Sequence, residues 1–322
     1  MGASKFLAAA AASILTLPAA YAAQPAYPDK PIRLIIGSAP GSGPDIISRL
    51  MADRMYATWN QRVVVDARPG AAGVISAELS LQANPDGYTW MMLTSQLLVA
   101  SQVFKKVPFD LARDFQSISL IGTAPFVLVI NPTVEAKSIP DLVALAKKSP
   151  GQLRYGSAGT GASEHLSGVQ FTQLTGTNIV HVPYKGVPQA IADTLAKEVH
   201  FSFAVPPAAL PHIQSGRLRA LGVTTPKRSS VLPDVPAIGE FVPGYQMTAW
   251  YSIVAPRGTP GMVLDVVNGE VVKATRDAQF VERLKNLGID PVGSTRAELD
   301  QFRAQQTKLI AGLVKVSGAT VE

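Results

Sequence analysis

Short apolar segments alternate with longer amphipathic ones, and this alternation constrains the fold more than any other feature of the chain. Apolar strands are predicted at 32–36, 63–65, 88–93, 126–130, 153–156, 180–182, 200–204, 218–223 and 250–254. Helices are predicted between them, at 44–57, 73–83, 139–148, 162–175 and 187–197, with further helices near the C-terminus. Strands that alternate with helices are typical of parallel α/β layers. The sequence therefore predicts an α/β fold.

Two segments of the chain share one design, in which a strand leads through a Gly/Ser-rich loop into a helix. The first loop reads Gly37-Ser-Ala-Pro-Gly-Ser-Gly-Pro-Asp45, and the second reads Gly156-Ser-Ala-Gly-Thr-Gly-Ala-Ser163. They lie about 120 residues apart, which is the span of one α/β domain. The 322 residues suffice for two such domains. We therefore expect two lobes, each with its own glycine-rich turn.

Both loops have the features of an anion site. A helix start presents unpaired backbone N–H groups and the positive end of the helix dipole, and glycine lets a ligand approach the backbone closely. The candidate groups are Ser38, Gly41, Ser42 and Gly43 in the first loop and Ser157, Gly159, Thr160, Gly161, Ala162 and Ser163 in the second. Either loop alone could be a simple turn that caps its helix. Two matched loops favour a shared cleft.

Two titratable residues beside the loops leave alternatives open. Asp45 follows the first loop, where an acid stabilises a helix start but would repel an anion, so loop bracing is favoured over ligand contact. His165 follows the second loop, and bracing or packing is favoured there too, with ligand contact as the alternative. A hydrolase could use Ser163 as nucleophile and His165 as base. Residues two apart on a helix do not face each other, which disfavours that arrangement.

Several other classes of protein are excluded or poorly supported. The chain has no Cys, which excludes a disulfide framework, a thiolate metal site and lipid attachment at an N-terminal Cys. Its four histidines show no metal-binding spacing, so we expect neither metal nor cofactor. The net charge of +6 is spread along the chain, whereas nucleic-acid binding needs a concentrated basic face. We therefore expect no nucleic-acid partner.

The N-terminus has the pattern of a secretory signal at residues 1–22. Lys5 supplies the positive charge, residues 6–17 form an apolar segment too short to span a bilayer, and Ala20-Tyr21-Ala22 fits a cleavage site. No later apolar run is long enough to cross a membrane. We therefore expect a periplasmic protein without a membrane anchor.

A series of motifs in fixed order resembles the Bug family, the TctC-type substrate-binding proteins of tripartite tricarboxylate transporters. Besides the two loops, the matching segments are Tyr27-Pro-Asp-Lys-Pro-Ile-Arg33, Arg68-Pro-Gly-Ala-Ala-Gly73, Pro85-Asp-Gly-Tyr-Thr89, His181-Val-Pro-Tyr-Lys-Gly186, Ala209-Leu-Pro-His-Ile213 and Arg217-Leu-Arg-Ala-Leu-Gly-Val-Thr224. Each motif alone is weak, but together they run along the whole mature chain and are highly specific.

The resemblance implies a type II periplasmic-binding-protein fold, with two α/β lobes joined by two crossing strands around a ligand cleft. Residues 23–124 would begin lobe 1, and residues 125–247 would form lobe 2. Residues 248–322 would supply a return strand and C-terminal helices that pack on lobe 1. The hinge is expected near 121–125 and 247–250.

The resemblance also implies a carboxylate ligand, held by backbone N–H groups and hydroxyls of the two loops. The expected ligand-binding residues are Ser38, Ala39, Gly41, Ser42, Asp45, Ser95, Ser157, Gly159, Thr160, Gly161, Ala162, Ser163, His165, Tyr184 and Val205. Many relatives carry Asp or Asn after the strand at 200–203, where this chain has Ala204-Val205-Pro206-Pro207. The loss of that polar group favours a ligand without an amino group, and a dicarboxylic or aromatic acid is expected.

These observations predict an exported, monomeric solute-binding protein rather than an enzyme. It would deliver a small organic carboxylate to the membrane permease subunits of a tripartite tricarboxylate transporter. Two alternatives remain: a secreted serine hydrolase using Ser163 and His165, and a ligand-sensing module for the sensor kinase of a two-component system.

Overall fold

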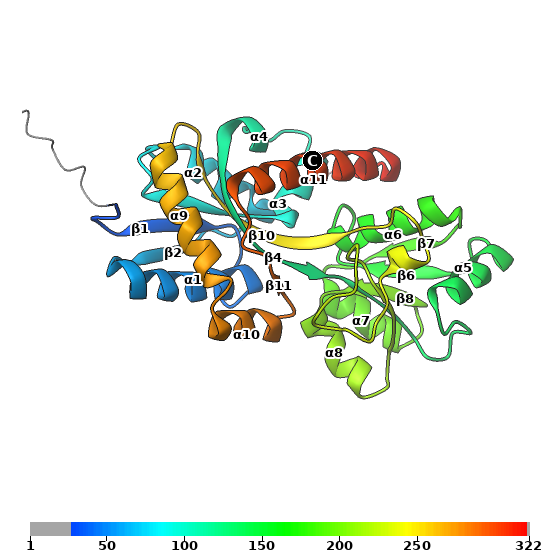
Figure 1. The fold of residues 1–322 in the computed structure, drawn as a ribbon. Coiled ribbons are helices and arrows are strands. Elements are labelled where there is room, and N and C mark those ends of the chain that lie inside the picture. Colours follow the sequence, from blue (N-terminus) through cyan, green and yellow to red (C-terminus); the bar gives the residue numbers. More distant parts are fainter. Residues whose placement is uncertain (1–26, 321–322) are drawn as a thin grey trace, which may run out of the picture.

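The computed structural model describes residues 27–320, so the predicted signal segment at 1–22 lies outside the described residues. The chain forms two groups of helices around two separate sheets, which lie side by side and are joined by extended strands (Figure 1). The first sheet contains β1 (Ile32–Ile36), β2 (Val63–Ala67), β3 (Thr89–Thr94), β4 (Phe115–Pro125), β10 (Thr248–Pro256) and β11 (Asp290–Pro291). The second contains β5 (Val127–Ile130), β6 (Arg154–Ser157), β7 (Val180–Pro183), β8 (Phe201–Ala204) and β9 (Arg219–Val223).

The two sheets share one strand order. The first runs β2-β1-β3-β10-β4 with β11 at its edge, and the second runs β7-β6-β8-β5-β9. In each sheet, the second strand in this order is parallel to both of its neighbours, as β1 is to β2 and β3 and as β6 is to β7 and β8. The strand that arrives from the other lobe, β10 or β5, pairs antiparallel with both of its neighbours. Each lobe is thus completed by one strand contributed across the boundary.

Helices cover both faces of the sheets, which explains why the strands are apolar runs rather than alternating patterns. In β1, Leu34, Ile35 and Ile36 are all fully buried. The α-helices are α1 (Gly43–Trp59), α2 (Val74–Leu81), α3 (Ser95–Val103), α4 (Leu111–Asp114), α5 (Ile139–Lys148), α6 (Ser163–Thr175), α7 (Val187–Leu195), α8 (Pro206–Gln214), α9 (Gly261–Ala274), α10 (Ala278–Asn286) and α11 (Arg296–Ser317). Two short 3₁₀ helices are η1 (Ala71–Gly73) and η2 (Ile238–Glu240).

The chain crosses between the lobes twice, and hydrogen bonds tie the two crossings together. The first crossing runs from β4 through the buried Phe126 into β5, and the second runs through Met247 into β10. Thr224 joins them: its Oγ1 accepts from the Phe126 amide at 2.8 Å, and its carbonyl accepts from the Met247 amide at 2.8 Å. The two connections between the lobes therefore lie next to each other.

The C-terminal segment is helical, as the sequence predicts, and it packs mainly against the first sheet. Arg303 of α11 is buried and donates to Ser117 Oγ in β4 at 2.8 Å. Phe302 packs edge-on against Trp250 in β10 at 5.7 Å between ring centroids. The red helix α11 also extends across to α6 of the second lobe (Figure 1). In residues 27–320, no helix has the length and apolarity to cross a bilayer.

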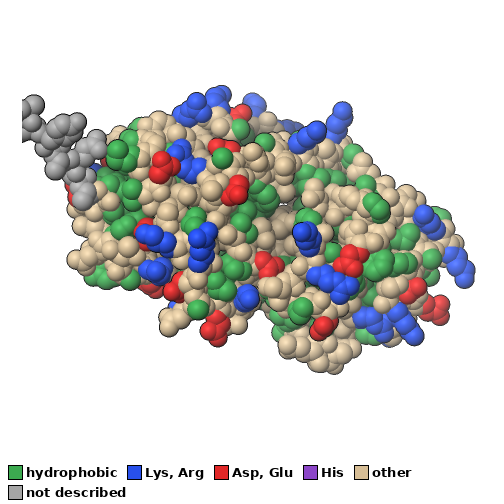
Figure 2. Space-filling view, in the orientation of Figure 1, with side chains coloured by type: hydrophobic (Ala, Val, Ile, Leu, Met, Phe, Trp, Pro, Cys, Tyr) green, Lys and Arg blue, Asp and Glu red, His purple; other side chains and the backbone are tan. Residues whose placement is uncertain are grey.

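The surface shown in Figure 2 carries Lys and Arg side chains scattered over both lobes, with Asp and Glu between them. They do not gather into one basic patch on this face. The even distribution agrees with the spread of charge along the sequence.

Candidate functional site

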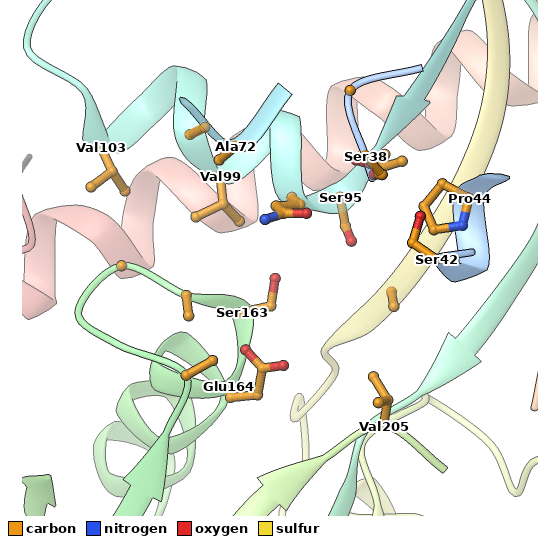
Figure 3. A pocket seen from close by; sticks show the side chains of 18 of the residues that line it. Ser38, Ser42, Pro44, Ala72, Ser95, Val99, Val103, Ser163, Glu164 and Val205 are labelled. Carbon is orange, nitrogen blue, oxygen red and sulfur yellow. The ribbon is translucent and has the colours of Figure 1, made fainter. Parts of the chain in front are cut away.

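A cleft of about 650 Å³ lies between the lobes, at the ends of several helices. Figure 3 shows Ser38, Ser42 and Ser95 of lobe 1 facing Ser163 and Glu164 of lobe 2 across it. The remaining lining residues are Gly37, Ala39, Pro44, Gly70, Ala72, Thr94, Gln96, Val99, Ala100, Val103, Phe104, Phe126, Ala158, Thr160, Gly161, Ala162, Val205, Ala249 and Tyr251. At one end the walls touch, because a Cβ atom on Gly161 would lie 2.9 Å from Val103 of α3.

The two glycine-rich loops share one backbone geometry at the two residues that lead into their helices. Gly41 and Gly161 adopt left-handed φ angles of 79° and 80°, which favour glycine. The next residues, Ser42 and Ala162, are the N-caps of α1 and α6, with nearly equal φ and ψ angles. The matched loops predicted from the sequence are therefore equivalent turns that face the cleft.

In each loop, the side chain four residues after the left-handed glycine accepts a hydrogen bond from that glycine. The Gly41 amide donates to Asp45 Oδ2 at 2.9 Å, and the Gly161 amide donates to His165 Nδ1 at 3.1 Å. Both acceptors are buried, with exposures of 3% and 6%. Asp45 and His165 therefore brace their loops.

Asp45 is neutralised by a neighbouring cation. Arg49, one helical turn further along α1, forms a salt bridge with it at 2.9 Å. The hydrogen bond from Arg49 holds the pKa of the Asp45 carboxyl below its usual range, aided by the Gly41 amide and opposed by burial. The first helix start thus presents no uncompensated negative charge to a ligand.

A stacked pair of histidines supports the second loop from behind. The His165 and His181 rings lie 4.0 Å apart, and His181 Nε2 lies 2.7 Å from Ser157 Oγ. Burial lowers the pKa of His181 to about 4, with a further contribution from His165. Ser157 is fully buried and does not line the cleft. His165, His181 and Ser157 therefore support the second loop without lining the cleft.

Three helix starts provide uncharged donors to the cleft. The first N–H groups of an α-helix have no acceptor within the helix, and α1, α3 and α6 all begin at the cleft wall. The hydroxyls of Ser38, Ser95, Thr160 and Ser163 form no hydrogen bond within residues 27–320, whereas Ser42 Oγ donates to the Ala39 carbonyl at 2.6 Å. Such an array suits a carboxylate, because hydrogen bonds to ionised acceptors are the stronger kind.

The expected site residues divide into two groups. Nine line the cleft: Ser38, Ala39, Ser42, Ser95, Thr160, Gly161, Ala162, Ser163 and Val205. The other six do not line it: Gly41, Asp45, Ser157, Gly159, His165 and Tyr184. Tyr184, for example, packs against the backbone of Gly156 and Gly159.

Sequence reasoning missed part of the wall. The cleft also contains Gln96, Val99, Val103, Phe104, Glu164 and Tyr251. The first four belong to α3 or its end, a helix that the sequence analysis did not predict. Glu164 adjoins the second loop, so an acid at the second position of a predicted helix was an available signal.

The hydrolase arrangement is not formed. His165 Nδ1 is occupied by the Gly161 amide, and the His165 ring stacks on His181, away from the Ser163 hydroxyl in the cleft. Among residues 27–320, no group of three His, Cys, Asp or Glu side chains could hold a metal ion.

Comparison with known proteins identifies the family. The family model described as "Tripartite tricarboxylate transporter family receptor" matches residues 47–318. The chain belongs to this family. As a TctC/Bug-type chain it is a receptor rather than an enzyme, and its two-lobed α/β architecture is the predicted type II periplasmic-binding-protein fold.

Individual TctC relatives match over most of their length. A UPF0065 protein from the tcbD-tcbE intergenic region of Pseudomonas sp. (strain P51) is 35% identical, over 87% of this chain and 84% of its own. BugT of Bordetella pertussis is 32% identical, over 92% of each chain. The solved structure described as R. palustris Rpa4515 with adipate is 29% identical, with a TM-score of 0.76, and covers 92% of this chain and 100% of its own.

Proposed function

We propose that this protein is an exported, periplasmic receptor that captures a small organic carboxylate in the interlobe cleft. The observation that carries the proposal is the convergence of three helix starts and four unpaired hydroxyls on a cleft of about 650 Å³. These groups supply donors without a fixed positive charge. A relative whose structure contains adipate supports the same ligand class.

The lining residues predicted from the sequence would hold the ligand directly. Ser38 and Ser95 would donate from lobe 1, and Thr160 and Ser163 would donate from lobe 2, together with the free amides at the helix starts. The six predicted residues that do not line the cleft would act by positioning the two loops. A dicarboxylic or aromatic acid fits the cleft volume, which lies in the usual range for small-molecule sites.

We propose that ligand binding brings the lobes together. The segments 23–124 and 248–322 would move as one body and 125–247 as the other, with the hinge at 121–125 and 247–250. The two crossings lie next to each other, with Thr248 paired to Pro125, which suits a hinge of two strands. The protein would act as a monomer, and its closed, ligand-bound form would deliver the ligand to the membrane subunits of a tripartite tricarboxylate transporter.

A thermal-shift screen against mono-, di- and tricarboxylates tests this proposal. One or more acids should raise the melting temperature, since a ligand that binds only the folded state stabilises it by about 2.7 kcal/mol at one hundred times Kd. The double variant Ser38→Ala/Ser95→Ala should lose most of the shift while it keeps its own melting temperature. A sugar or a metal ion that stabilises the protein when no carboxylate does would overturn the proposal.

A further inference from the structure

Glu164 is the one carboxylate among the residues that line the cleft. It is the second residue of α6, and its side chain extends from lobe 2 into the space that faces Ser38, Ser42 and Ser95 (Figure 3). Only 8% of the residue is exposed. An acid is therefore held at the ligand position of a cleft that is otherwise built from uncharged donors.

The Glu164 carboxylate has no partner in another residue. Within residues 27–320 it forms no ion pair and no hydrogen bond with a neighbouring side chain. Burial raises the pKa of Glu164, an effect that its own backbone amide partly offsets. Buried charged groups are normally paired or hydrogen-bonded, because an unpaired one is costly. The missing partner is thus expected to come from a molecule in the cleft.

The residue that stands at the position of Glu164 differs between the two equivalent loops, so the two walls of the cleft differ in chemistry. In the equivalent loops, Pro44 of lobe 1 occupies the place of Glu164 of lobe 2, and both line the cleft. The acid at the lobe 1 helix start, Asp45, is turned away and paired with Arg49. Lobe 1 therefore presents only uncharged polar groups to the cleft, whereas lobe 2 also presents one carboxylate.

Tyr251 of β10 also lines the cleft, close to the start of α1. Its hydroxyl lies 3.8 Å from the position that a Cβ atom on Gly43 would take, at the start of α1. Burial and the nearby charge of Glu164 raise the pKa of Tyr251 to about 12. Tyr251 and Glu164 line the same cleft as Ser42 and Pro44 at the start of α1.

We propose that Glu164 is a specificity-determining residue that selects a carboxylate bearing a separate hydrogen-bond donor, either a hydroxyl or an ammonium group. This inference rests on the proposed function. The ligand carboxylate would face the lobe 1 donors at Ser38 and Ser95, and its donor group would face Glu164. Glu164 thereby replaces, from a different element, the polar group that is missing at Ala204–Val205. A hydroxyl on the ligand agrees with the expected absence of an amino group, and an ammonium group would not.

Calorimetric titration with matched acids tests the inference. The probes are succinate, both enantiomers of malate and of aspartate, benzoate and 3-hydroxybenzoate. Wild-type protein should bind the donor-bearing acid of a set about tenfold more tightly than the plain acid, since a hydrogen bond to a charged group contributes that much. Preference for malate identifies a hydroxyl, and preference for aspartate identifies an ammonium group.

Two substitutions then separate charge from shape. Glu164→Gln keeps the size and one acceptor and should shrink the preference severalfold, and Glu164→Met should abolish it. Neither should lower the melting temperature, because each removes an unpaired buried acid. Glu282→Gln on the exposed face of α10 removes the same charge outside the cleft and should leave the preference unchanged.

The inference is overturned if wild type binds succinate and benzoate as tightly as their substituted partners, or if the preference is the same in all variants. Glu164 could act instead in its protonated form, as a donor to a second carboxylate of the ligand. Succinate would then bind most tightly, Glu164→Gln would bind it as tightly as wild type does, and the inference would be overturned. The proposed function fails separately, if none of the acids binds wild-type protein.

Discussion

At the residue scale, two bracing side chains of different charge hold the two equivalent loops. Asp45 is charged and compensated by Arg49, whereas His165 is uncharged and backed by His181. Both accept a hydrogen bond from a left-handed glycine. The same backbone turn therefore responds differently to acid in each lobe.

Acidification should destabilise the protein partly through the histidine pair. The folded pKa of His181 is about 4, below its ordinary value of 6.5, so the folded protein keeps this imidazole neutral. Between these values the unfolded chain binds the proton that the folded chain excludes, so the free energy of unfolding falls as pH drops from 6.5 towards 4. Urea unfolding of wild type and His181→Gln at several pH values measures this.

Comparison of wild type with His181→Gln isolates the contribution of the histidine, because the carboxylates titrate in both proteins. The variant should show a shallower loss of stability from pH 6.5 downwards, since it lacks the group that must charge on unfolding. His165 and Tyr155 are the titratable groups packed against His181, and neither is changed. Parallel curves for wild type and variant would contradict the assignment.

For Asp45 and His165, the sequence predicted a bracing role but not which atoms they bind. The bracing role favoured for Asp45 and His165 follows from an acceptor placed near a helix start, a local relation that sequence carries. Glu164 left a local signal beside the second loop, but Tyr251 was missed because its place in the cleft depends on how β10 meets the two loops. That relation joins residues far apart along the chain.

At the element scale, α6 connects the second loop to the core of its lobe. Its first turn carries the cleft-lining Ser163 and Glu164, and its next turns pack the buried Leu166 and Phe171 against the sheet. The position of the second loop therefore depends on how tightly α6 packs against the sheet.

Gly168→Ala should destabilise the protein by this route. A Cβ atom at Gly168 would lie 2.2 Å from the ring of Tyr155, which is buried in β6. Overpacking of this kind costs about 1–3 kcal/mol. Chemical denaturation of the variant measures the loss.

Gly269→Ala is the matched control, because Gly269 also lies within a helix, α9, and a Cβ atom there meets nothing within 4 Å. It should be neutral or stabilising by about 0.5–1 kcal/mol, since alanine has the higher helix propensity. Equal effects of the two substitutions would show that α6 packs less tightly than described.

The elements were predicted where the local pattern is strong and missed where it is mixed. Strand β1 and helix α5 follow clear apolar patterns, and the Ser138 side chain caps the start of α5. Helix α3 was missed because it follows β3 without a loop and continues an apolar run. Helix α8 was missed because Pro206, Pro207 and Pro211 argue against a helix, although the first two occupy its first turn, where proline is tolerated.

At the scale of the whole molecule, the lobes contact each other outside the cleft as well as at the two crossings. Asp290 of β11, in the first sheet, accepts a hydrogen bond from Ser229 Oγ of the second lobe at 2.7 Å. It also accepts from the Ser230 amide at 3.2 Å. This contact stabilises the arrangement in which both walls can reach one ligand.

Asp290→Ala should weaken ligand binding without touching the cleft. Loss of the contact favours separated lobes, so affinity for the acid found by thermal shift should fall by about three- to tenfold, mainly through faster dissociation. Stopped-flow dissociation rates measure this. Asp234→Ala, an exposed acid in the same loop as Ser229, is the control. Identical rates for the two variants would show that the contact does not influence closure.

The central claim is that one small carboxylate binds between the lobes, and a crystal structure with the most stabilising acid tests it most directly. The account predicts a carboxylate within hydrogen-bond distance of Ser38 or Ser95 and of the helix starts of α1 or α3, with a donor group of the ligand facing Glu164. An acid bound on the outer surface, or a cleft that stays empty beside saturating acid, would contradict it.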